Sequence, residues 1–362
     1  MKKFSLIIIA ALLISLFAGC AGTPVVYYTN CTCPAGSHEN VSAETEAPDV
    51  TEAPVLVEGE LKTGLCITTN ISGSKNATAE ENGEVSYDIT VAAVLVDEKG
   101  VIIDCVFDSI PATVAFDSTG VISTDLTAEI LSKYEQGEGY GMKLYGGSQY
   151  EWYEQADALA AYAVGKTVEE LKSGAVSESG HAVDADLAST ASIKLGDYVA
   201  AIEGAVNNAQ VLGAKSGDQL KLAAISGLGS SKSADAENAG LAQLDVDVVA
   251  LTMNGDVITS CYIDSLQAKV SFGADGVITT DLTAPVQTKN ELGEAYNMKL
   301  YGGAQYEWNE QASSFAAYVT GKTAADVAGI AVSEGKPADA DLSATVTIAI
   351  GGFQALIAKA AK

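Results

Sequence analysis

The sequence predicts an α+β protein made of two tandem repeats, each with a small antiparallel meander sheet packed by one long helix and one or two short helices. Three observations support this fold class. The hexapeptide MKLYGG at 142–147 returns at 298–303. Alternating, turn-punctuated segments precede each copy, and segments with helical periodicity follow it. We therefore predict repeat domains at residues 61–208 and 209–362, each of a size usual for one domain.

The N-terminus has the features of a secretion signal. Two lysines precede an apolar run from Leu6 to Phe17, which is too short for a comfortable membrane span. The sequence LFAGC resembles a bacterial lipobox, so we predict a lipoprotein signal peptide at 1–19 and lipid modification of Cys20. This implies an extracytoplasmic protein anchored to the cell membrane. An ordinary signal peptide followed by an unmodified Cys is the alternative.

Residues 20–60 and the overall charge limit the classes of partner. The segment is rich in Pro, Thr, Glu, Ala and Ser, which predicts a disordered spacer between membrane and folded body. The formal net charge is −27 at pH 7, and the sequence contains no Arg. Such a surface repels nucleic acid and has no guanidinium groups for bidentate phosphate recognition. We therefore exclude nucleic acid as a partner.

The first repeat begins with predicted strands. Tyr87 to Val96 alternates in the β manner, and after the turn DEKG comes a second strand, Val101 to Phe107. A further pair at Thr113 to Phe116 and Val121 to Ser123 would complete a four-stranded meander. The second repeat predicts the same pattern, with a turn at Asn254-Gly255-Asp256 and strands at Leu244 to Met253, Val257 to Ile263, Lys269 to Phe272 and Val277 to Thr279.

A long helix is predicted to follow each set of strands. Apolar residues recur at i, i+4, i+7 and i+11, which gives one stripe suited to cover a sheet face. These residues are Trp152, Ala156, Leu159 and Ala163 in the first repeat and Trp308, Ala312, Phe315 and Val319 in the second.

Capping residues predict where these helices end and the next ones begin. Gly165 and Gly321 are expected C-terminal caps, and Thr167 and Thr323 are expected N-caps of short second helices. Each repeat should then close with a β-like stretch and a small apolar helix. The stretches are Ala191 to Leu195 and Val346 to Ile350, and the helices are Asp197 to Ala205 and Phe353 to Ala361.

Candidates for catalysis or metal binding are few. Only His38 and His181 occur, and neither is repeated, which disfavours hydrolase triads and His-based zinc sites. His181 is expected in a surface loop. The repeated acids Glu151, Glu154, Glu307 and Glu310 are expected in the first turns of the long helices, facing solvent and interacting favourably with the helix dipole. We therefore predict no catalytic residue and no metal ligand. We expect a carrier or binding protein rather than an enzyme.

The cysteines leave their pairing undetermined. Besides Cys20 the chain contains Cys31, Cys33, Cys66, Cys105 and Cys261. Cys105 and Cys261 occupy equivalent positions of the two repeats on predicted strands, where a small buried hydrophobic residue is favoured over a reactive thiol.

The acidic segment DADLAST at 184–190 returns as DADLSAT at 339–345. It resembles the flavinylation motif of the FMN-binding domain family, in which Asp, a turn rich in small residues and a terminal Thr or Ser occur at this spacing. In that family a flavin transferase links the FMN phosphate to the Thr hydroxyl. The resemblance implies FMN-binding residues at Asp339, Ser343, Ala344 and Thr345 in the second copy and at Asp184 and Thr190 in the first. The alternative is an acidic turn whose Asp residues cap the chain before its last strand.

Two functional hypotheses follow. The resemblance implies a membrane-anchored electron carrier with tandem FMN-binding-like domains, a flavin transferase and a redox partner. The other hypothesis is a non-enzymatic surface lipoprotein that binds a solute, the cell wall or a protein. The chain is also similar to uncharacterised surface lipoproteins of Gram-positive bacteria in its pattern of ELG, YxM and EWxEQ.

A pocket for the second hypothesis would involve aromatic and Met side chains near the repeated hexapeptide. The same side chains would alternatively fill the gap between helix and sheet. They are Tyr140, Met142, Trp152, Tyr296, Met298 and Trp308.

Overall fold

The computed structural model describes residues 59–362. The predicted signal peptide, Cys20, Cys31, Cys33, His38 and nearly all of the predicted spacer lie outside the described residues. Residues 59–362 belong to one compact unit. This body is α+β with antiparallel sheets, as the sequence predicts. Below, the first half means residues 59–208 and the second half means residues 209–362.

Each half contributes one three-stranded antiparallel sheet in meander order. The first sheet consists of β1 (Lys62–Asn70), β2 (Gly83–Val96) and β3 (Ile102–Phe116). The second consists of β4 (Gln219–Gly227), β5 (Gly240–Asn254) and β6 (Val257–Phe272). A two-residue ribbon, β7 (Val332–Ser333) and β8 (Lys336–Pro337), lies in the second half.

Helices follow the sheet in each half. The first half has α1 (Lys133–Gln136), η1 (Gly137–Tyr140), α2 (Trp152–Ala163), α3 (Val168–Ala175), α4 (Ala185–Thr190) and α5 (Gly196–Asn207). The second half has α6 (Lys289–Leu292), η2 (Gly293–Tyr296), α7 (Met298–Gly302), α8 (Trp308–Val319), α9 (Ala324–Ala328), α10 (Ala340–Ser343) and α11 (Gly351–Ala360). There are thus more short helices than the sequence predicts.

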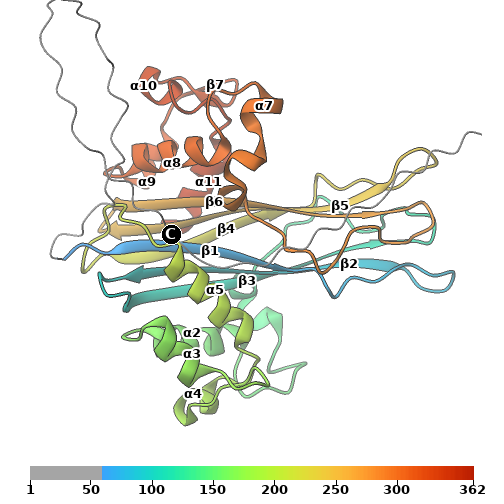
Figure 1. Cartoon of the computed structure of the whole chain (residues 1–362), viewed down its shortest axis with the longest axis horizontal. Coiled ribbons are helices and arrows are strands. Elements are labelled where there is room, and N and C mark those ends of the chain that lie inside the picture. Colours follow the sequence, from blue (N-terminus) through green and yellow to red (C-terminus); the bar gives the residue numbers. More distant parts are fainter. Residues whose placement is uncertain (1–58) are drawn as a thin grey trace, which may run out of the picture. The chain divides into compact units, whose positions relative to one another are not determined.

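The two sheets lie against each other and the helices cover their outer faces (Figure 1). Helices α2 and α5 contact the first sheet, and α8 and α11 contact the second. The stretch of β2 from Thr90 to Val96 is buried on both faces, because one face meets the other sheet and the opposite face meets helices. Toward Gly83 the outward-facing residues of β2 are more exposed, because the helical layer does not extend over that end of the strand.

The core between the sheets draws on both halves. Inward-facing residues of β2 and β3 pack with those of β5 and β6. At its end the rings of Phe116 and Phe272 stack with centroids 4.2 Å apart and planes 10° apart. The hydroxyls of Thr63 and Ser260 form a buried hydrogen bond of 2.7 Å between the halves. Each half therefore completes the hydrophobic core of the other.

Reciprocal hydrogen bonds join the two halves near the ends of the long strands. Ala77 N donates to Gly276 O at 2.9 Å, and Ala234 N donates to Gly120 O at 2.8 Å. A Cβ on Gly120 would lie 2.6 Å from the Ala234 Cβ, and a Cβ on Gly276 would lie 2.7 Å from the Ala77 Cβ. Glycine is required at both positions, since they combine positive φ with this close approach.

The strand predictions were partly wrong. The predicted strands Val101 to Phe107 and Thr113 to Phe116 are one continuous strand, β3, which passes through Pro111. Pro111 is tolerated because β3 is an edge strand, where a residue without an N–H removes no necessary ladder bond. The predicted strand around Ile122 is only a single bridge to Phe116, and β1 was not predicted. Each sheet therefore has three strands, not four.

The helix predictions were mostly confirmed. The predicted apolar stripes of α2 and α8 are buried. Thr167 and Thr323 form capping boxes with residues three positions later, at the starts of α3 and α9. Gly165 and Gly321 have φ of +81° and +85° directly after the helix ends.

Candidate functional site

The first half contains a cavity of about 300 Å³ at the place where its helical layer ends over the first sheet. We call it the Lys133 cavity. Its floor comes from the outer face of β2 and β3, and its walls come from α1, η1, α2 and the start of α5. The cavity therefore combines residues from both layers of the first half.

The aromatic wall contains three residues that the sequence suggested as a pocket. Tyr140, Met142 and Trp152 all line the Lys133 cavity, together with Tyr198 of α5. Trp152 is buried, and its Nε1 donates to the Tyr198 hydroxyl at 3.0 Å. Its ring also meets Phe107 edge to face. Trp152 thus belongs to the core and at the same time forms a cavity wall.

Lys133 is the half-buried cation of this cavity. Its Nζ lies 5.3 Å from the ring centroid of Tyr140 and 5.6 Å from that of Trp152, within cation–π range. No carboxylate of residues 59–362 lies within 4.0 Å of this Nζ. Burial acts to lower the pKa of Lys133, but the nearby Tyr198, Tyr140 and Asp88 outweigh it, so the pKa lies above its ordinary value. The cavity therefore presents a charged ammonium to a ligand.

Two hydroxyl groups lie on the cavity floor. Thr90 and Ser109 are cross-strand partners on β2 and β3, and they are only 6% and 2% exposed. Within the part of the chain that the structure describes, neither hydroxyl makes a hydrogen bond, and neither oxygen is among the fully enclosed atoms that lack a partner. Both hydroxyls are therefore open to the cavity, where each can donate to or accept from a ligand atom.

Two aspartates, one buried and one half-buried, position the lysine-bearing helices. Asp108 Oδ1 accepts from Tyr134 N of α1 at 3.1 Å, and Asp264 Oδ1 accepts from Asn290 N of α6 at 3.1 Å. Burial raises the pKa of both carboxyl groups, to about 6 for Asp264. These contacts join each short helix to the sheet and so set the place of Lys133 and of its counterpart, Lys289.

Buried glutamates hold the repeated hexapeptide. Glu151 Oε2 accepts from Met142 N at 2.9 Å, and Glu307 Oε2 accepts from Met298 N at 2.7 Å. Glu151 and Glu307 are 4% and 3% exposed, so the expectation that they face solvent was wrong. The reason is that each carboxylate turns toward the backbone of the preceding loop, whose N–H groups replace water.

Structural roles account for only some of the residues that the two hexapeptide copies share. Lys143 pairs with Glu154 at 2.7 Å, and the equivalent pair in the second half is Lys299 with Glu310 at 3.1 Å. The final glycines have positive φ. In contrast, the tyrosines of both copies are 84% exposed, and the adjacent leucines are also exposed.

Two buried glutamines determine the path of the segments after the acidic motif. Gln155 Oε1 accepts from Ser192 N, and Gln311 Oε1 accepts from Thr347 N, both at 2.8 Å. Their amide groups donate to carbonyls of the repeated QYEW segments. The predicted strands at 191–195 and 346–350 are therefore absent, since α2 and α8 bind their backbone instead. The first of these segments contributes Ile193 to the Lys133 cavity.

The second half has a corresponding lysine with different surroundings. Lys289 Nζ lies 5.4 Å from the Tyr296 ring centroid and 4.7 Å from that of Trp308. Burial lowers the pKa of Lys289, although the nearby Asp247 and two further aspartates act to raise it. Asp247 also accepts a hydrogen bond from the Ser265 hydroxyl.

The key difference is one residue in the sheet. Thr90 pairs with Ser109 in the first sheet, and Asp247 occupies the matching position beside Ser265 in the second. The second half therefore supplies its own carboxylate to the serine hydroxyl. The same carboxylate acts electrostatically on Lys289, although it lies more than 4.0 Å from the Lys289 Nζ.

The predicted pocket residues of the second half do not lie around one cavity. Tyr296 lines a different cavity of about 470 Å³, together with Gln267, Lys269 and Lys289. Trp308 is buried in the helix-side core, and Met298 packs against that core.

The predicted flavin residues lie on two short helices. Asp184 caps α4 by accepting from Leu187 N at 3.1 Å, and Asp339 caps α10 by accepting from Leu342 N at 3.0 Å. Both aspartates therefore cap the chain, as the acidic-turn interpretation predicts, but each caps a short helix, and no strand directly follows it.

Both candidate acceptor threonines are half-exposed. Thr190 Oγ1 donates to Asp186 O at 3.3 Å, and Thr345 Oγ1 donates to Leu342 O at 3.4 Å. Ser343 is the last residue of α10 and Ala344 is its C-cap, so both adjoin Thr345.

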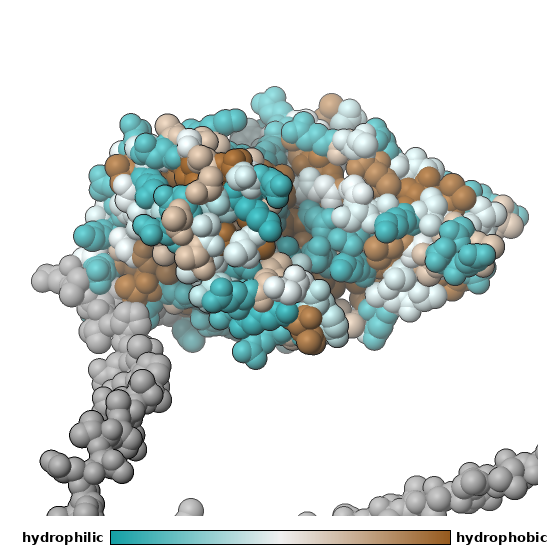
Figure 2. Space-filling view, turned by 90° about the horizontal axis from the view of Figure 1, so that it is seen from above, coloured by the Kyte–Doolittle hydropathy of each residue, from teal (hydrophilic) through white to brown (hydrophobic). Residues whose placement is uncertain are grey.

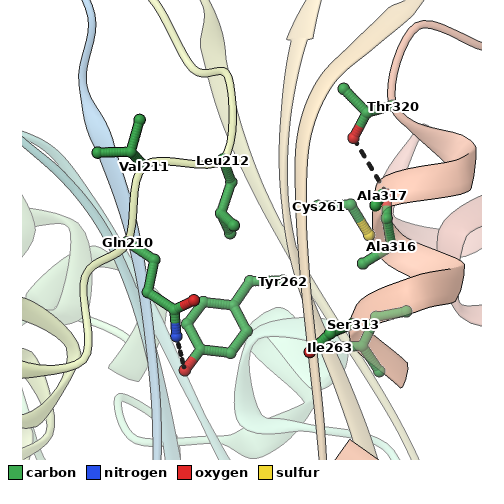
Figure 3. Close-up of a pocket in the computed structure, with 10 residues that line it drawn as sticks. All are labelled: Gln210, Val211, Leu212, Cys261, Tyr262, Ile263, Ser313, Ala316, Ala317 and Thr320. Atoms are coloured by element: carbon green, nitrogen blue, oxygen red, sulfur yellow. Dashed lines mark hydrogen bonds between the residues drawn. The ribbon is translucent and has the colours of Figure 1, made fainter. Parts of the chain in front are cut away.

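A third cavity, of about 340 Å³, lies between the segment that connects the halves and the helix α8 (Figure 3). Gln210 donates to the Tyr262 hydroxyl across it at 3.0 Å. Val211, Leu212, Ile263 and Ala316 line it, and none of the residues that line it is charged. This cavity suits apolar groups but offers no group for ionic recognition.

The described cysteines are unsuited to nucleophilic chemistry. Cys66, Cys105 and Cys261 are free and buried. Burial raises the thiol pKa to about 11 for Cys66 and to about 12 for Cys105, and it also raises that of Cys261. The prediction of buried hydrophobic cysteines at 105 and 261 was thus confirmed. His181 is exposed in a loop, as predicted.

The described residues contain neither a candidate metal site nor a candidate membrane-spanning helix. Residues 59–362 contain no group of three or more His, Cys, Asp or Glu side chains placed to hold a metal ion. Among the described helices none is long and apolar enough to cross a bilayer. Hydrophilic and hydrophobic residues alternate over the face shown in Figure 2.

The sequence analysis missed the lysines and the floor hydroxyls. The segments SKYEQGEGYGM at 132–142 and TKNELGEAYNM at 288–298 share Lys, Gly-Glu, Tyr and Met at matching positions. Aligning the two halves would therefore have identified Lys133 and Lys289. Nothing in the sequence indicates that Thr90 and Ser109 lie beside Lys133.

Comparisons of the chain with protein-family models, curated proteins and solved structures found no match. Its functional interpretation therefore depends on the site geometry and on the sequence features described above.

Proposed function

We propose that the protein is an extracytoplasmic, lipid-anchored binding protein that holds a small organic ligand in the Lys133 cavity. The single observation that carries this proposal is a half-buried ammonium enclosed by aromatic rings, above two hydroxyls without hydrogen-bond partners. Small-molecule sites typically combine such apolar walls with a few convergent polar groups. The signal and lipobox features of residues 1–20 support the location, and the spacer would give the body reach from the membrane.

We further propose that the two halves are tandem repeats that arose by duplication. The repeated segments MKLYGG and QYEW support this, as do the reciprocal contacts of Gly120 and Gly276. In a duplicated protein, one copy is free to lose or change its ligand site while both copies keep the shared core.

Thermal melting of the full chain tests the binding proposal. The probes are small carboxylates, phosphate esters, amines and amino acids at millimolar concentration, because a ligand that binds only the folded state raises the melting temperature. We expect at least one class to raise the melting temperature of the native protein and to lose most of this effect in Lys133→Gln. The matched control is Lys289→Gln, which should keep the response. No response in the native protein, or an unchanged response in Lys133→Gln, contradicts the proposal.

A second proposal is a flavin-based electron carrier, with FMN attached by a flavin transferase to Thr345 or Thr190. It is supported by the half-exposed position of both threonines and by the capping aspartates that precede them. A redox partner would then exchange electrons with the flavin. Protein purified from its native host should show flavin absorbance that survives denaturation and disappears in Thr345→Ala or Thr190→Ala. A colourless native protein contradicts this proposal.

A further inference from the structure

The surroundings of Lys289 in the second half indicate which ligand group would fit beside Lys133 in the first half. Asp247 places a carboxylate beside Lys289, and that carboxylate accepts a hydrogen bond from Ser265. The first half has the same lysine and serine, as Lys133 and Ser109, but Thr90 replaces the aspartate. A ligand carboxylate over Thr90 would meet the ammonium of Lys133 and the two floor hydroxyls. Such charge-assisted hydrogen bonds are among the stronger ones in proteins.

The rim of the Lys133 cavity carries two carboxylates and one lysine, Lys194, so the acidic groups outnumber the basic one there. Asp88 lies at the end of the floor on β2, and Asp197 lies in the first turn of α5. Both are exposed, whereas Lys133 is half-buried. A ligand whose carboxylate lies deep and whose ammonium lies near the rim would therefore match both charges. A zwitterion has no net charge, so the chain's net charge of −27 would not repel it as it would repel a simple anion.

The walls and the volume limit the rest of the ligand. Tyr140, Trp152, Tyr198 and Met142 provide an apolar lining, which suits an aliphatic or aromatic side chain. A cavity of about 300 Å³ is at the small end of ligand sites, which suits one amino acid better than a peptide.

From these observations we propose that the Lys133 cavity binds an α-amino acid with an apolar side chain. The carboxylate lies against Lys133, Thr90 and Ser109, the ammonium faces Asp88 and Asp197, and the side chain contacts the aromatic wall. This inference rests on the proposed binding function and specifies its ligand class.

Isothermal titration of the full chain with matched compounds tests the assignment. The set comprises L-leucine, 4-methylpentanoate, which lacks the ammonium, and 3-methylbutylamine, which lacks the carboxylate, with methionine and phenylalanine sets in parallel. We expect the amino acids to bind at least about tenfold more tightly than either single-charge analogue, since each lost ionic contact leaves a polar group unmatched. If no amino acid binds, or if the deaminated acids bind equally well, the amino-acid assignment is wrong.

Variants separate this inference from the proposed function. Thr90→Asp copies the second half and should abolish amino-acid binding, because its carboxylate would occupy the ligand's position. Asp88→Asn combined with Asp197→Asn should weaken the binding of amino acids without weakening that of 4-methylpentanoate, because the loss of two carboxylates reduces the repulsion of a simple anion. Lys289→Gln is the matched control and should bind normally. Binding of 4-methylpentanoate alone, lost in Lys133→Gln, would overturn the amino-acid inference while leaving the binding function standing. If no compound in the thermal screen binds, both the amino-acid inference and the proposed binding function are wrong.

Discussion

The two halves contain the same lysine between the same Tyr and Trp, yet the lysines have different carboxylate neighbours. Lys289 lies beside Asp247, which also binds Ser265. Lys133 has Thr90 at the corresponding place, and both lysines line cavities, of about 300 Å³ for Lys133 and about 470 Å³ for Lys289. One difference in the middle strand of a sheet therefore places a carboxylate near the lysine of the second half and leaves that position uncharged in the first.

The two halves share some features and differ in others. The shared features include the aspartates that hold α1 and α6, the glutamates that clamp the repeated hexapeptide and the glutamines that hold the segments after the acidic motif. These groups are buried or half-buried and hydrogen-bonded, so their loss would leave unpaired polar atoms. The differing residues line the surface of the cavity, where a change of side chain costs the fold little.

The largest expected effect concerns the core that the halves share. Phe116→Ala and Phe272→Ala should each lower the free energy of unfolding by about 3–5 kcal/mol, as for other buried Phe residues. The double variant should cost less than the sum, because each ring stacks on the other. Urea unfolding measures this. Separate transitions for the two halves would show that they do not share one cooperative core.

The next effect is a pH dependence in the second half. Burial raises the pKa of Asp264 from 3.8 to about 6, so the folded state binds this proton more tightly than the unfolded chain does. The stabilisation of the fold by this bound proton is complete below about pH 4 and is lost as the pH rises through about 6. At about 1.36 kcal/mol per unit of pKa difference, it contributes at most about 3 kcal/mol to the free energy of unfolding.

Asp264→Asn should remove that part of the pH dependence between pH 4 and 7, as urea unfolding at several pH values will measure. Asp108→Asn is the matched variant of the first half, where burial also raises the pKa. A pH profile unchanged by Asp264→Asn would show that this carboxyl does not titrate in the range.

The glutamate clamps should contribute equally to both halves. Glu151→Ala and Glu307→Ala should each cost about 1–3 kcal/mol, because buried N–H groups of the hexapeptide lose their acceptor. Amide hydrogen exchange at Met142 or Met298 should report the local release. Lys143→Ala, which removes the exposed ion pair with Glu154 and leaves the capping box of α2 in place, is the control and should cost less than about 1 kcal/mol. Only Glu151→Ala should weaken ligand binding, since Met142 lines the Lys133 cavity.

Asp247→Thr tests the comparison from the other side. It removes one hydrogen bond to Ser265 and should cost about 1 kcal/mol. With the internal carboxylate gone, Lys289 should respond to added carboxylates, measurable as a second, weaker binding event by titration. A stability loss without any new binding would indicate that other residues also close the second site.

The smallest effect should be at the candidate flavin acceptors. The Thr345 and Thr190 hydroxyls only donate to backbone carbonyls of their own short helices. Thr345→Ala and Thr190→Ala should therefore change the unfolding free energy by less than about 0.5 kcal/mol. Circular dichroism melts measure this. A large destabilisation would mean that these variants cannot serve as clean tests for flavin attachment.

Local patterns in the sequence predicted much of the architecture. The apolar stripes of α2 and α8, the capping boxes at Thr167 and Thr323 and the turn at Gly255 all follow from contacts within a few residues. The failures have a common cause. Two strands were predicted where β3 is continuous through Pro111, because the sequence does not show that this strand lies at an edge. The segment 191–195 was assigned as a strand because its backbone partner, Gln155, is distant in the sequence.

The sequence by itself determined the duplication of its segments, the positions of the long helices and the predicted route to the membrane, because periodicity, capping and signal features are local. Only the tertiary structure decided that the two sheets share one core and that Lys133, Thr90 and Ser109 meet in one cavity. These residues are separated along the chain by up to 43 positions, and their meeting depends on strand pairing and on where the helical layer ends. The importance of Thr90 opposite Asp247 appears only when the register of both sheets is known, since each residue alone is ordinary for a strand.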